Sequence, residues 1–425
     1  MATSETVRLL RRPGYARYFT VVAATRATGT MFIVGGPLLV LQRTHSLTLA
    51  GLVVAAETVA GAFTGPLLGA WLDVTASRRR LLVLDRAVTV LALVALLALA
   101  GHAPNWMLPV VALVLGATTP LSAGAFSSVL PEIAGDELLA IANTFEATSI
   151  NTAFIVGPAL AGVIAGTAGA TAVILVQILA CVVLTALIAG DETFELRPEH
   201  GGSPPSGILQ AVEQGLSSLW RIAPLRWNTL VGVVYVTGWG MLNVGFPAYA
   251  VKVGAGAHSS GYMWAAVAVG SMASAFALRR AASRLRPRVL IGFSFLAMAA
   301  SAAAWPLAGS LAGALALIVL TGALEGPSLV ALITVRQRLA PPHLRGQVFS
   351  TAGSLDLAAI GAGAAIAGPL QAGLGTDATL LVFGALLVLA GLLSLATDSD
   401  GEVGRVAHRG ARAAEPAILH GPHNE

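Results

Sequence analysis

Charged residues are scarce in this sequence, because Asp, Glu, Lys and Arg together make up 11% of its 425 residues. Soluble domains carry about 25% charged residues, so a water-soluble globule of this length would lack the charged surface it needs. The sequence also has a single cysteine, Cys181, which excludes internal disulfides and zinc clusters made of thiolates. The low charge argues against a soluble protein before any motif is considered.

Motifs for catalysis and cofactor binding are missing as well. An intramembrane enzyme would need a convergent catalytic set, and we find no helix with metal-ligand spacing, no G-x-S-x-G elbow and no phosphate-binding loop. The sequence therefore predicts no metal, no cofactor and no enzyme activity. Without a nucleotide-binding motif, ATP-driven pumping is also disfavoured.

Apolar residues and glycine are abundant instead. Hydrophobic residues make up 56% of the chain, there are 47 glycines, and the mean hydropathy is +0.79. Glycine permits the close helix contacts that hold helices together in lipid. Twelve apolar segments are long enough to cross a bilayer. These predicted spans are residues 17–42, 49–74, 81–101, 105–130, 140–168, 170–190, 226–251, 259–280, 288–308, 310–337, 346–373 and 376–397.

An internal repeat divides the chain into two similar halves. Residues 131–162 align with residues 337–368, and the same shift relates basic loops and glycines elsewhere. The matched positions are Gly157 and Gly162 with Gly363 and Gly368, Ser77, Arg78 and Arg80 with Ser283, Arg284 and Arg286, and Gly116-Ala117 with Gly322-Ala323. Such a duplication predicts an all-α membrane transporter with twelve transmembrane helices in two pseudo-symmetric six-helix bundles.

The same pattern sets the predicted domain boundaries. We assign residues 1–190 to the first bundle, 191–225 to a cytoplasmic linker, 226–397 to the second bundle and 398–425 to a disordered tail. Apolar residues recur at helical spacing in the linker, which predicts a short amphipathic helix on the membrane surface. A helix that only tethers the halves is the alternative. The recurring residues are Ile208, Leu209, Val212, Leu216, Leu219 and Trp220.

Basic residues indicate the orientation. Almost all arginines fall in loops on the side of the two termini, whereas Arg43 and Lys252 lie on the opposite side and Arg26 lies within a span. The positive-inside rule therefore places both termini in the cytoplasm. This asymmetry also accounts for the net charge of +4, so no nucleic-acid partner is expected. The first span has no cleavage pattern before it and is expected to be retained.

The loop after the second predicted span carries a compact motif, GAWLDVTASRRR. Gly69 and Asp73 share one helix face near the cytoplasmic end, and Arg78 and Arg79 follow in the loop. A carboxylate beside a cluster of arginines can form a charge network that holds one state of a gate. Ordinary positive-inside charge would explain the arginines alone, but it leaves the spacing of Gly69 and Asp73 unexplained.

At this point the chain resembles the major facilitator superfamily. The resemblance covers twelve spans, two halves, a central loop and the G-x-x-x-D-x-x-x-x-R signature. Ala76 stands where the signature usually has glycine, and Arg279 occupies the position that matches Asp73 in the second half. The resemblance implies a monomeric, proton-coupled transporter of small molecules in a bacterial plasma membrane, surrounded by lipid and working by alternating access.

A second motif, VGPALAG in the fifth span, bears on the direction of transport. Gly157, Pro158 and Gly162 resemble the G-P-x-x-G-G element of the superfamily's drug and metabolite antiporters, with Ala161 as a departure. That likeness favours drug efflux by an antiporter. A kinked helix that serves only packing is the alternative, and proton-coupled uptake or a non-transporting sensor on the same fold stay open.

Five ionisable residues lie well inside the predicted spans, away from the span ends, and each costs about 2.5–3.5 kcal/mol at a helix centre on insertion scales. None is reproduced in the other half, so these residues are candidates for proton coupling. Arg26 is expected to pair with Glu57 or Glu146. Glu325 and Asp356 have no basic residue at similar depth in their own spans, which makes them the stronger candidates to exchange a proton. The candidates are Arg26, Glu57, Glu146, Glu325 and Asp356.

The seventh span offers a candidate substrate wall. Tyr235, Trp239 and Asn243 lie on one helix face, and aromatic faces with one amide suit a lipophilic or planar ligand, including a cation. A packing stripe between helices is the alternative. Asn151 in the fifth span is a weaker candidate for the same cavity.

Overall fold

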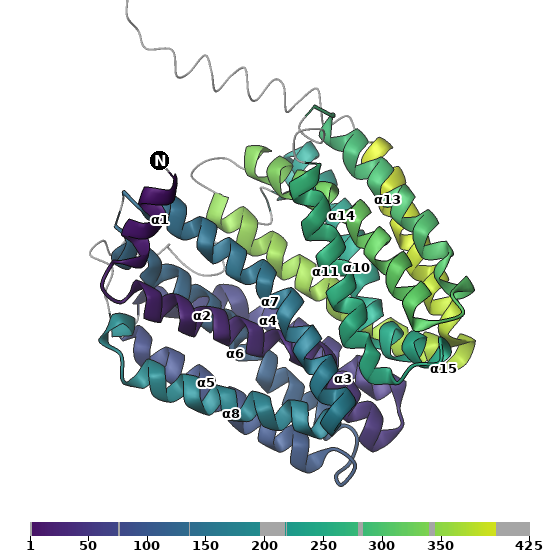
Figure 1. The fold of residues 1–425 in the computed structure, drawn as a ribbon, viewed down its shortest axis with the longest axis horizontal. Coiled ribbons are helices and arrows are strands. Elements are labelled where there is room, and N and C mark those ends of the chain that lie inside the picture. The colour runs from purple at the N-terminus through teal and green to yellow at the C-terminus, as the bar shows by residue number, and fades with distance from the viewer. Residues whose placement is uncertain are drawn as a thin grey trace, which may run out of the picture.

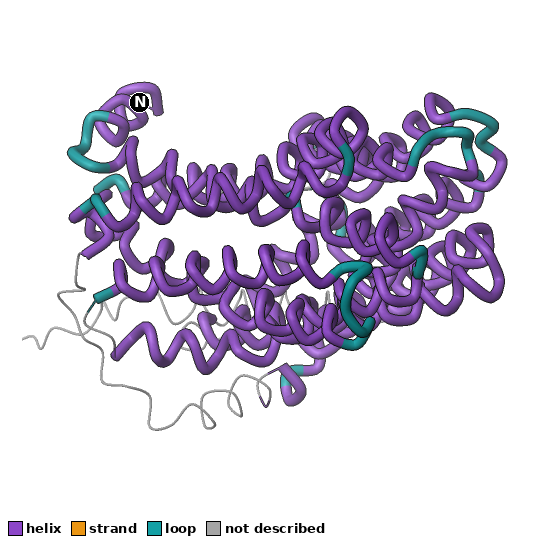
Figure 2. The backbone as a smooth tube through the Cα atoms, turned by 90° about the horizontal axis from the view of Figure 1, so that it is seen from below, coloured by secondary structure: helices purple, strands orange, loops and turns teal. Residues whose placement is uncertain are grey.

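The structure is a computed structural model, and it describes residues 2–74, 77–135, 137–195, 217, 219–278, 284–339 and 345–396. All regular structure in these ranges is helical (Figure 2). Figure 1 shows the early helices, in purple to teal, gathered on one side and the later helices, in green to yellow, on the other. We call α1–α8 the N half and α10–α15 the C half.

The helices follow the predicted spans closely. The N half contains α1 (Ala2–Leu10), α2 (Tyr15–Thr30), α3 (Phe32–Thr44), α4 (Leu47–Val74), α5 (Arg78–Leu99), α6 (Met107–Ala134), α7 (Leu139–Ala168), α8 (Ala170–Ala189) and the 3-10 helix η1 (Glu192–Glu195). The C half contains α10 (Ala223–Lys252), η2 (Ala257–Ser259), α11 (Ser260–Ala277), α13 (Pro287–Ala303), η3 (Trp305–Leu307), α14 (Leu311–Leu339) and α15 (Arg345–Ala396).

Three spans differ from the prediction in their continuity. The first is divided at Met31 into α2 and α3. The last two form the single element α15, which changes direction at Gly375 with φ 82° and ψ −178°, a conformation that glycine adopts without steric cost. Within the described ranges, nine helical segments are long and apolar enough to cross a membrane.

Local sequence explains where the helices begin and end. The Ser46 hydroxyl accepts a hydrogen bond from the backbone N–H of Leu49 at 3.1 Å and so caps the start of α4. Pro224 and Pro287 occupy the first turns of α10 and α13, where proline's missing N–H costs nothing. Gly169 has φ 84° and separates α7 from α8. At these positions, the helix boundaries follow from the capping, proline and glycine residues of the sequence.

The main buried apolar clusters lie within the two halves. The largest cluster of the C half contains aromatic side chains of α10, α13 and α15 with Trp305 of η3. The N half has one cluster around α3, α4 and α5 and another around α2, α6 and η1. Each half therefore has apolar cores built mainly from its own helices.

The linker and tail can be compared with the prediction only in part. Most of the predicted linker helix and all of the predicted tail lie outside the described residues. Leu219 is buried in a small cluster with Leu225, Val335 and Leu339 of the C half, whereas Trp220 is 58% exposed. Leu219 thus packs against protein at the entrance to the C half.

Candidate functional site

Arg26 and Glu146 form an ion pair between α2 and α7. The Arg26 Nη2 atom lies 2.6 Å from Glu146 Oε1, and Nη1 donates to Ser149 Oγ at 2.5 Å. Of the two partners expected from the sequence, the structure selects Glu146. Both side chains are largely buried, and removing one partner of such a pair leaves an uncompensated charge at a cost of about 3–5 kcal/mol.

A second ion pair joins α14 to α15 and gives Asp356 a partner that was not expected from the sequence. The Arg336 Nη1 atom lies 3.2 Å from Asp356 Oδ2. The span of Asp356 itself contains no cation at similar depth, and the position of Arg336 near the end of its span had suggested a cytoplasmic loop residue. Its guanidinium instead reaches into the bundle, because a long arginine side chain can place its charge well away from its Cα atom. Asp356 therefore has a cationic partner from the neighbouring helix.

The remaining two intramembrane carboxylates, Glu57 and Glu325, form no ion pair within the described part of the chain. Glu325 in α14 is 7% exposed and accepts a hydrogen bond from the hydroxyl of Tyr235 in α10. Glu57 in α4 has the hydroxyl of Thr58 at 3.4 Å. Among the described residues, no Arg, Lys or His forms an ion pair with either carboxylate. A carboxylate in such surroundings is the kind that takes up a proton.

The aromatic face of α10 points into the C half. Tyr235 stacks on Phe295 of α13 with 4.8 Å between ring centroids, and Trp239 contacts Trp264 of α11 and Phe383 of α15. Tyr235 and Trp239 belong to the main C-half core. The packing alternative accounts for these two contacts, whereas the substrate-wall interpretation requires a cavity beside them. Helical spacing showed that the residues share a face, but not which neighbour that face meets.

The two amides of the predicted cavity give less information. Asn243 is buried, and its side-chain amide donates to the carbonyl oxygen of Gly240 in its own helix at 3.1 Å. The side chain of Asn151 lies outside the described residues. Asn243 is thus satisfied within its own helix, and the role of Asn151 stays a prediction.

The loop motif after α4 is only partly described. The side chain of Asp73 and the surroundings of Gly69 lie outside the described residues. Arg78 is buried, with Nη1 3.4 Å from Glu132 Oε1 at the end of α6, and Arg79 Nη2 lies 2.7 Å from Glu195 Oε1 in η1. The arginines of the motif thus reach two carboxylates that the sequence analysis did not single out.

The start of the linker is fastened to the N half beside this loop. Phe194 of η1 is fully buried between Tyr18 and Phe126. Asp191 precedes it and lies 3.4 Å from Arg17. Burial alone would raise the pKa of Asp191, but hydrogen bonds from Thr193 and the charge of Arg17 outweigh burial and hold that pKa below its ordinary value. These contacts keep Asp191 ionised and η1 in place.

One further buried charge cluster was missed by sequence reasoning. Arg86 was counted among the loop cations, yet it is buried in α5 and lies 2.6 Å from Asp85. Its Nη2 atom also donates to Ser122 Oγ of α6 at 2.9 Å. The adjacent Asp85-Arg86 pair is readable in the sequence, but the hydrophobic pattern gives no sign that both side chains turn inward. The cluster stabilises the contact of α5 with α6.

The glycines of the VGPALAG segment lie at two different helix contacts. Gly157 packs against α2, where a Cβ atom would lie 2.6 Å from the carbonyl oxygen of Ala27. Gly162 packs against the C half, where a Cβ atom would lie 2.9 Å from the Cα atom of Gly261 in α11. Pro158 lies between them inside α7 without ending the helix. The motif therefore joins α7 to both halves.

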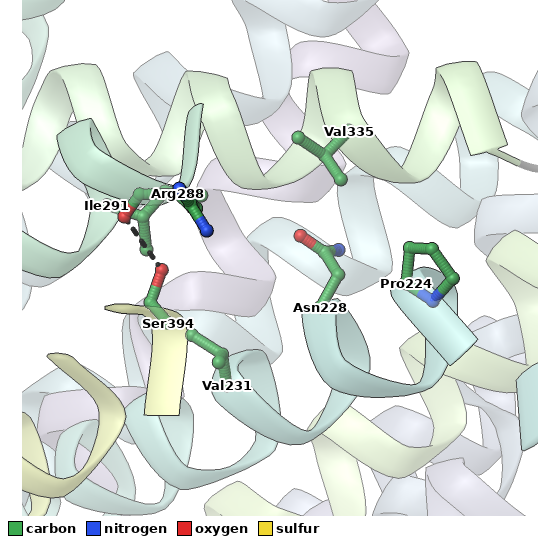
Figure 3. A pocket seen from close by; sticks show the side chains of 7 residues that line it. All are labelled: Pro224, Asn228, Val231, Arg288, Ile291, Val335 and Ser394. Carbon is green, nitrogen blue, oxygen red and sulfur yellow. Dashed lines mark hydrogen bonds between the residues drawn. The ribbon is translucent and has the colours of Figure 1, made fainter. Parts of the chain in front are cut away.

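A small pocket opens between α10, α13, α14 and the end of α15 (Figure 3). Its wall includes Asn228, Arg288, Val335 and Ser394. The Asn228 amide donates to the carbonyl oxygen of Leu332 at 3.3 Å, and the Ser394 hydroxyl donates to the carbonyl oxygen of Arg288 at 3.0 Å. These polar groups hold helices of the C half together, and none of the intramembrane carboxylates is among the residues that line the pocket.

The sequence matches the profile of one protein family over most of its length. The match to the Major Facilitator Superfamily covers residues 18–355, and a second match covers residues 229–420. The chain belongs to the Major Facilitator Superfamily. The resemblance found in the sequence is thereby confirmed, and the protein is an integral membrane transporter of a superfamily of secondary transporters, not an enzyme.

Named relatives cover nearly the whole of this superfamily member. It is 29% identical over 398 residues to the "Multidrug efflux pump Tap" of Mycobacterium tuberculosis, covering 91% of this chain and 93% of the relative. It is 28% identical over 402 residues to the "Uncharacterized MFS-type transporter y4rN" of Sinorhizobium fredii, covering 92% and 96%. The similarity therefore extends through both halves.

Solved structures agree with the superfamily fold. A bacterial homologue of the iron transporter ferroportin in an inward-facing state has a TM-score of 0.64 at 18% identity, covering 89% of this chain and 98% of that one. The human organic anion transporter MFSD10 has a TM-score of 0.63 at 14% identity, covering 89% and 97%. A D-xylose-proton symporter has a TM-score of 0.64 at 15% identity, covering 90% and 98%. At these identities the likeness shows the fold alone.

Proposed function

We propose that this protein exports small lipophilic compounds in exchange for protons by alternating access. The observation that carries the proposal is the buried carboxylate of Glu325, which has the neutral Tyr235 hydroxyl as its partner and no ion pair among the described residues. Protonation from outside would remove a buried charge and favour the return of the empty transporter. Deprotonation towards the cytoplasm would accompany capture of the next substrate.

Export is favoured over uptake by two observations. The relatives named as multidrug efflux pumps cover 91% of the chain, and the Gly157-Pro158 motif resembles the antiporter element. The two carboxylates without a cation, Glu57 and Glu325, add negative charge at membrane depth, which suits a cationic or protonatable substrate. Such a substrate would give the protein a role in drug resistance.

We also infer twelve membrane crossings with both termini in the cytoplasm. Helices α6 and α11 pack lengthwise against the spanning helices α4 and α14, and Gly375 divides α15 into two arms. Added to the nine segments that meet the length and hydropathy criteria, they complete six crossings in each half. Arg8, Arg17, Arg78 and Arg79 form ion pairs at the end of the bundle that carries the N-terminus, as the positive-inside rule expects.

Transport by everted membrane vesicles tests the proposed function. A fluorescent lipophilic cation is expected to accumulate inside vesicles whose interior has been acidified, and a protonophore should abolish the accumulation. Loss of preloaded dye under the same gradient would instead identify proton-coupled uptake. Accumulation without any dependence on the gradient would remove the antiport proposal, and absence of transport for a wide panel of compounds would favour a sensor.

The loop after α4 is proposed to latch the cytoplasmic gate, and Asp73→Asn tests it. Without its charge, Asp73 can no longer hold the arginines of the loop, so turnover should fall severalfold while the affinity for substrate stays close to that of the wild type. The measurements are the kcat of vesicle transport and equilibrium dye binding to purified protein. Asp377→Asn, at the opposite end of the bundle, is the matched control. Unchanged transport in Asp73→Asn would count against the latch.

A further inference from the structure

Two equivalent helix crossings, one in each half, organise the intramembrane carboxylates. In the N half, Gly116 of α6 packs directly against the backbone of Glu57 in α4. In the C half, Gly322 of α14 packs in the same way against the backbone of Val267 in α11. Gly116 and Gly322 are matched by the internal repeat. The two crossings are therefore counterparts in sequence and in packing.

Each crossing carries one carboxylate, although the two come from opposite partners. Glu57 lies on α4 at the contact with Gly116. Glu325 lies on α14, one helical turn beyond Gly322, so it shares the face of that glycine. The adjacent Gly326 packs against Ser271 and Ser274 of α11, which places Glu325 at the same interface. The two glutamates are not aligned by the repeat. Glu57 lies on the helix that faces Gly116, whereas Glu325 lies on the same helix as Gly322.

The ion pairs of the two halves are likewise formed by residues that the repeat does not align. Arg26 aligns with Gly232 of α10, which has no side chain to offer. The guanidinium of Arg336 occupies that space, since a Cβ atom at Gly232 would lie 3.4 Å from Arg336 Nη2, and it pairs with Asp356. Of the carboxylates predicted for proton coupling, each half thus has one that pairs with an arginine and one without an ion pair among the described residues, although none of these positions is aligned.

The surroundings of the two unpaired carboxylates are alike in charge. Helices α3, α6, α10 and α15 pack against α4. Among the described residues, Arg43 and Glu132 lie at the ends of α3 and α6, Asp356 of α15 has its own ion pair, and Lys252 of α10 pairs with Asp377 of α15. Helices α10, α11 and α13 pack against α14. Within the described residues they offer Tyr235 beside Glu325, Lys252 paired with Asp377 at the end of α10, and Arg226 and Arg288 near the starts of their helices.

We propose that Glu57 is a second proton-binding site, equivalent to Glu325, so that each half of the transporter carries one titrating carboxyl group. The proposal rests on proton coupling as the function. It implies that two protons enter each transport cycle, one bound by each bundle. Protonation of Glu57 would neutralise the contact of α4 with α6 while the ion pair of Arg26 with Glu146 keeps its charges.

Infrared spectroscopy of the purified, ligand-free protein tests the site without relying on transport. The band of protonated carboxylic acids is followed between about pH 6 and 9, above the ordinary range of Asp and Glu, in light and heavy water. Wild type is expected to show two titrating groups, Glu57→Gln and Glu325→Gln about half of that signal each, and the double variant none. Glu137→Gln removes an exposed glutamate and should leave the band unchanged.

Two results would overturn the proposal. One is a band of wild-type intensity in Glu57→Gln; the other is loss of the whole band in Glu325→Gln. Glu57→Asp guards against misfolding, because a folded variant that keeps a carboxyl group should restore the signal at a shifted frequency. If both groups titrate but a pH gradient drives no vesicle transport, the coupling function fails while the two sites stand.

Discussion

Glu325→Gln is expected to abolish transport driven by a pH gradient. Glutamine keeps the size of the side chain and an oxygen that can accept the hydrogen bond from Tyr235, but it cannot release a proton. The variant should therefore behave as a transporter fixed in the protonated state, with accumulation of dye in acidified everted vesicles reduced to the level of vesicles without the protein. Exchange of labelled for unlabelled dye without a gradient should fall as well, because capture of the substrate is proposed to accompany a deprotonation that glutamine cannot undergo.

Two controls separate loss of coupling from loss of structure. Glu325→Asp keeps a titratable group and should retain part of the gradient-driven transport. Asp377→Asn changes an acidic residue at the end of the bundle that has Lys252 as its partner, and it should transport like the wild type. Gradient-driven accumulation by Glu325→Gln at the wild-type rate would show that the proton is carried elsewhere.

The positions of the helices could be predicted from the sequence because lipid imposes strong rules on membrane segments. Each predicted span falls on a helix, since a buried backbone in hydrocarbon must satisfy its own hydrogen bonds. The repeat identified glycines at real helix contacts, including Gly116, Gly162, Gly322 and Gly368. These features depend on composition and local spacing, which a single sequence displays directly.

Pairing of charges could not be predicted to the same degree. The partner of Arg26 was narrowed to two residues, but Arg336 was counted as a loop cation because it lies near the end of its span. The conformation of an arginine side chain decides whether its charge lies in the loop or inside the bundle. The position of the residue in the sequence does not determine that conformation. Arg86 was misplaced for the same reason, and it is buried against Asp85.

The aromatic face of α10 shows a second limit. Periodicity correctly placed Tyr235 and Trp239 on one side of the helix, yet a helix of this kind has neighbours on several sides. Phe295 and Phe383 come from α13 and α15, which are distant in sequence. The choice between core and cavity is therefore made by tertiary packing, which no local pattern encodes.

Gly162→Leu is expected to hold the transporter open on its extracellular side and to stop transport. The tight contacts between the halves at that end are made by glycine. A Cβ atom at Gly162 would lie 2.9 Å from the Cα atom of Gly261, and one at Gly368 would lie 2.6 Å from the Cα atom of Thr48. These neighbours are backbone atoms, so they cannot turn aside as a side chain could. A leucine fits only if the halves separate.

The internal repeat provides a second variant that tests the same prediction. Gly162 and Gly368 are matched positions, one on each side of the interface, so Gly368→Leu should give the same result as Gly162→Leu. Gly373 lies in α15 near the same end and has open space around it. Gly373→Leu is therefore the matched control and should transport normally.

Labelling from outside the cell measures the opening. In a Cys181→Ala background, Val244→Cys places a reporter in α10, where the native Val244 is 1% exposed and packs beside Gly51 of α4. A membrane-impermeant maleimide should label the reporter slowly in the parent and rapidly in both leucine variants. Because the reporter lies on a different helix pair from Gly162, rapid labelling would show that the bundles rock as rigid bodies. Slow labelling in Gly162→Leu, or rapid labelling in Gly373→Leu, would contradict a glycine seal between the halves.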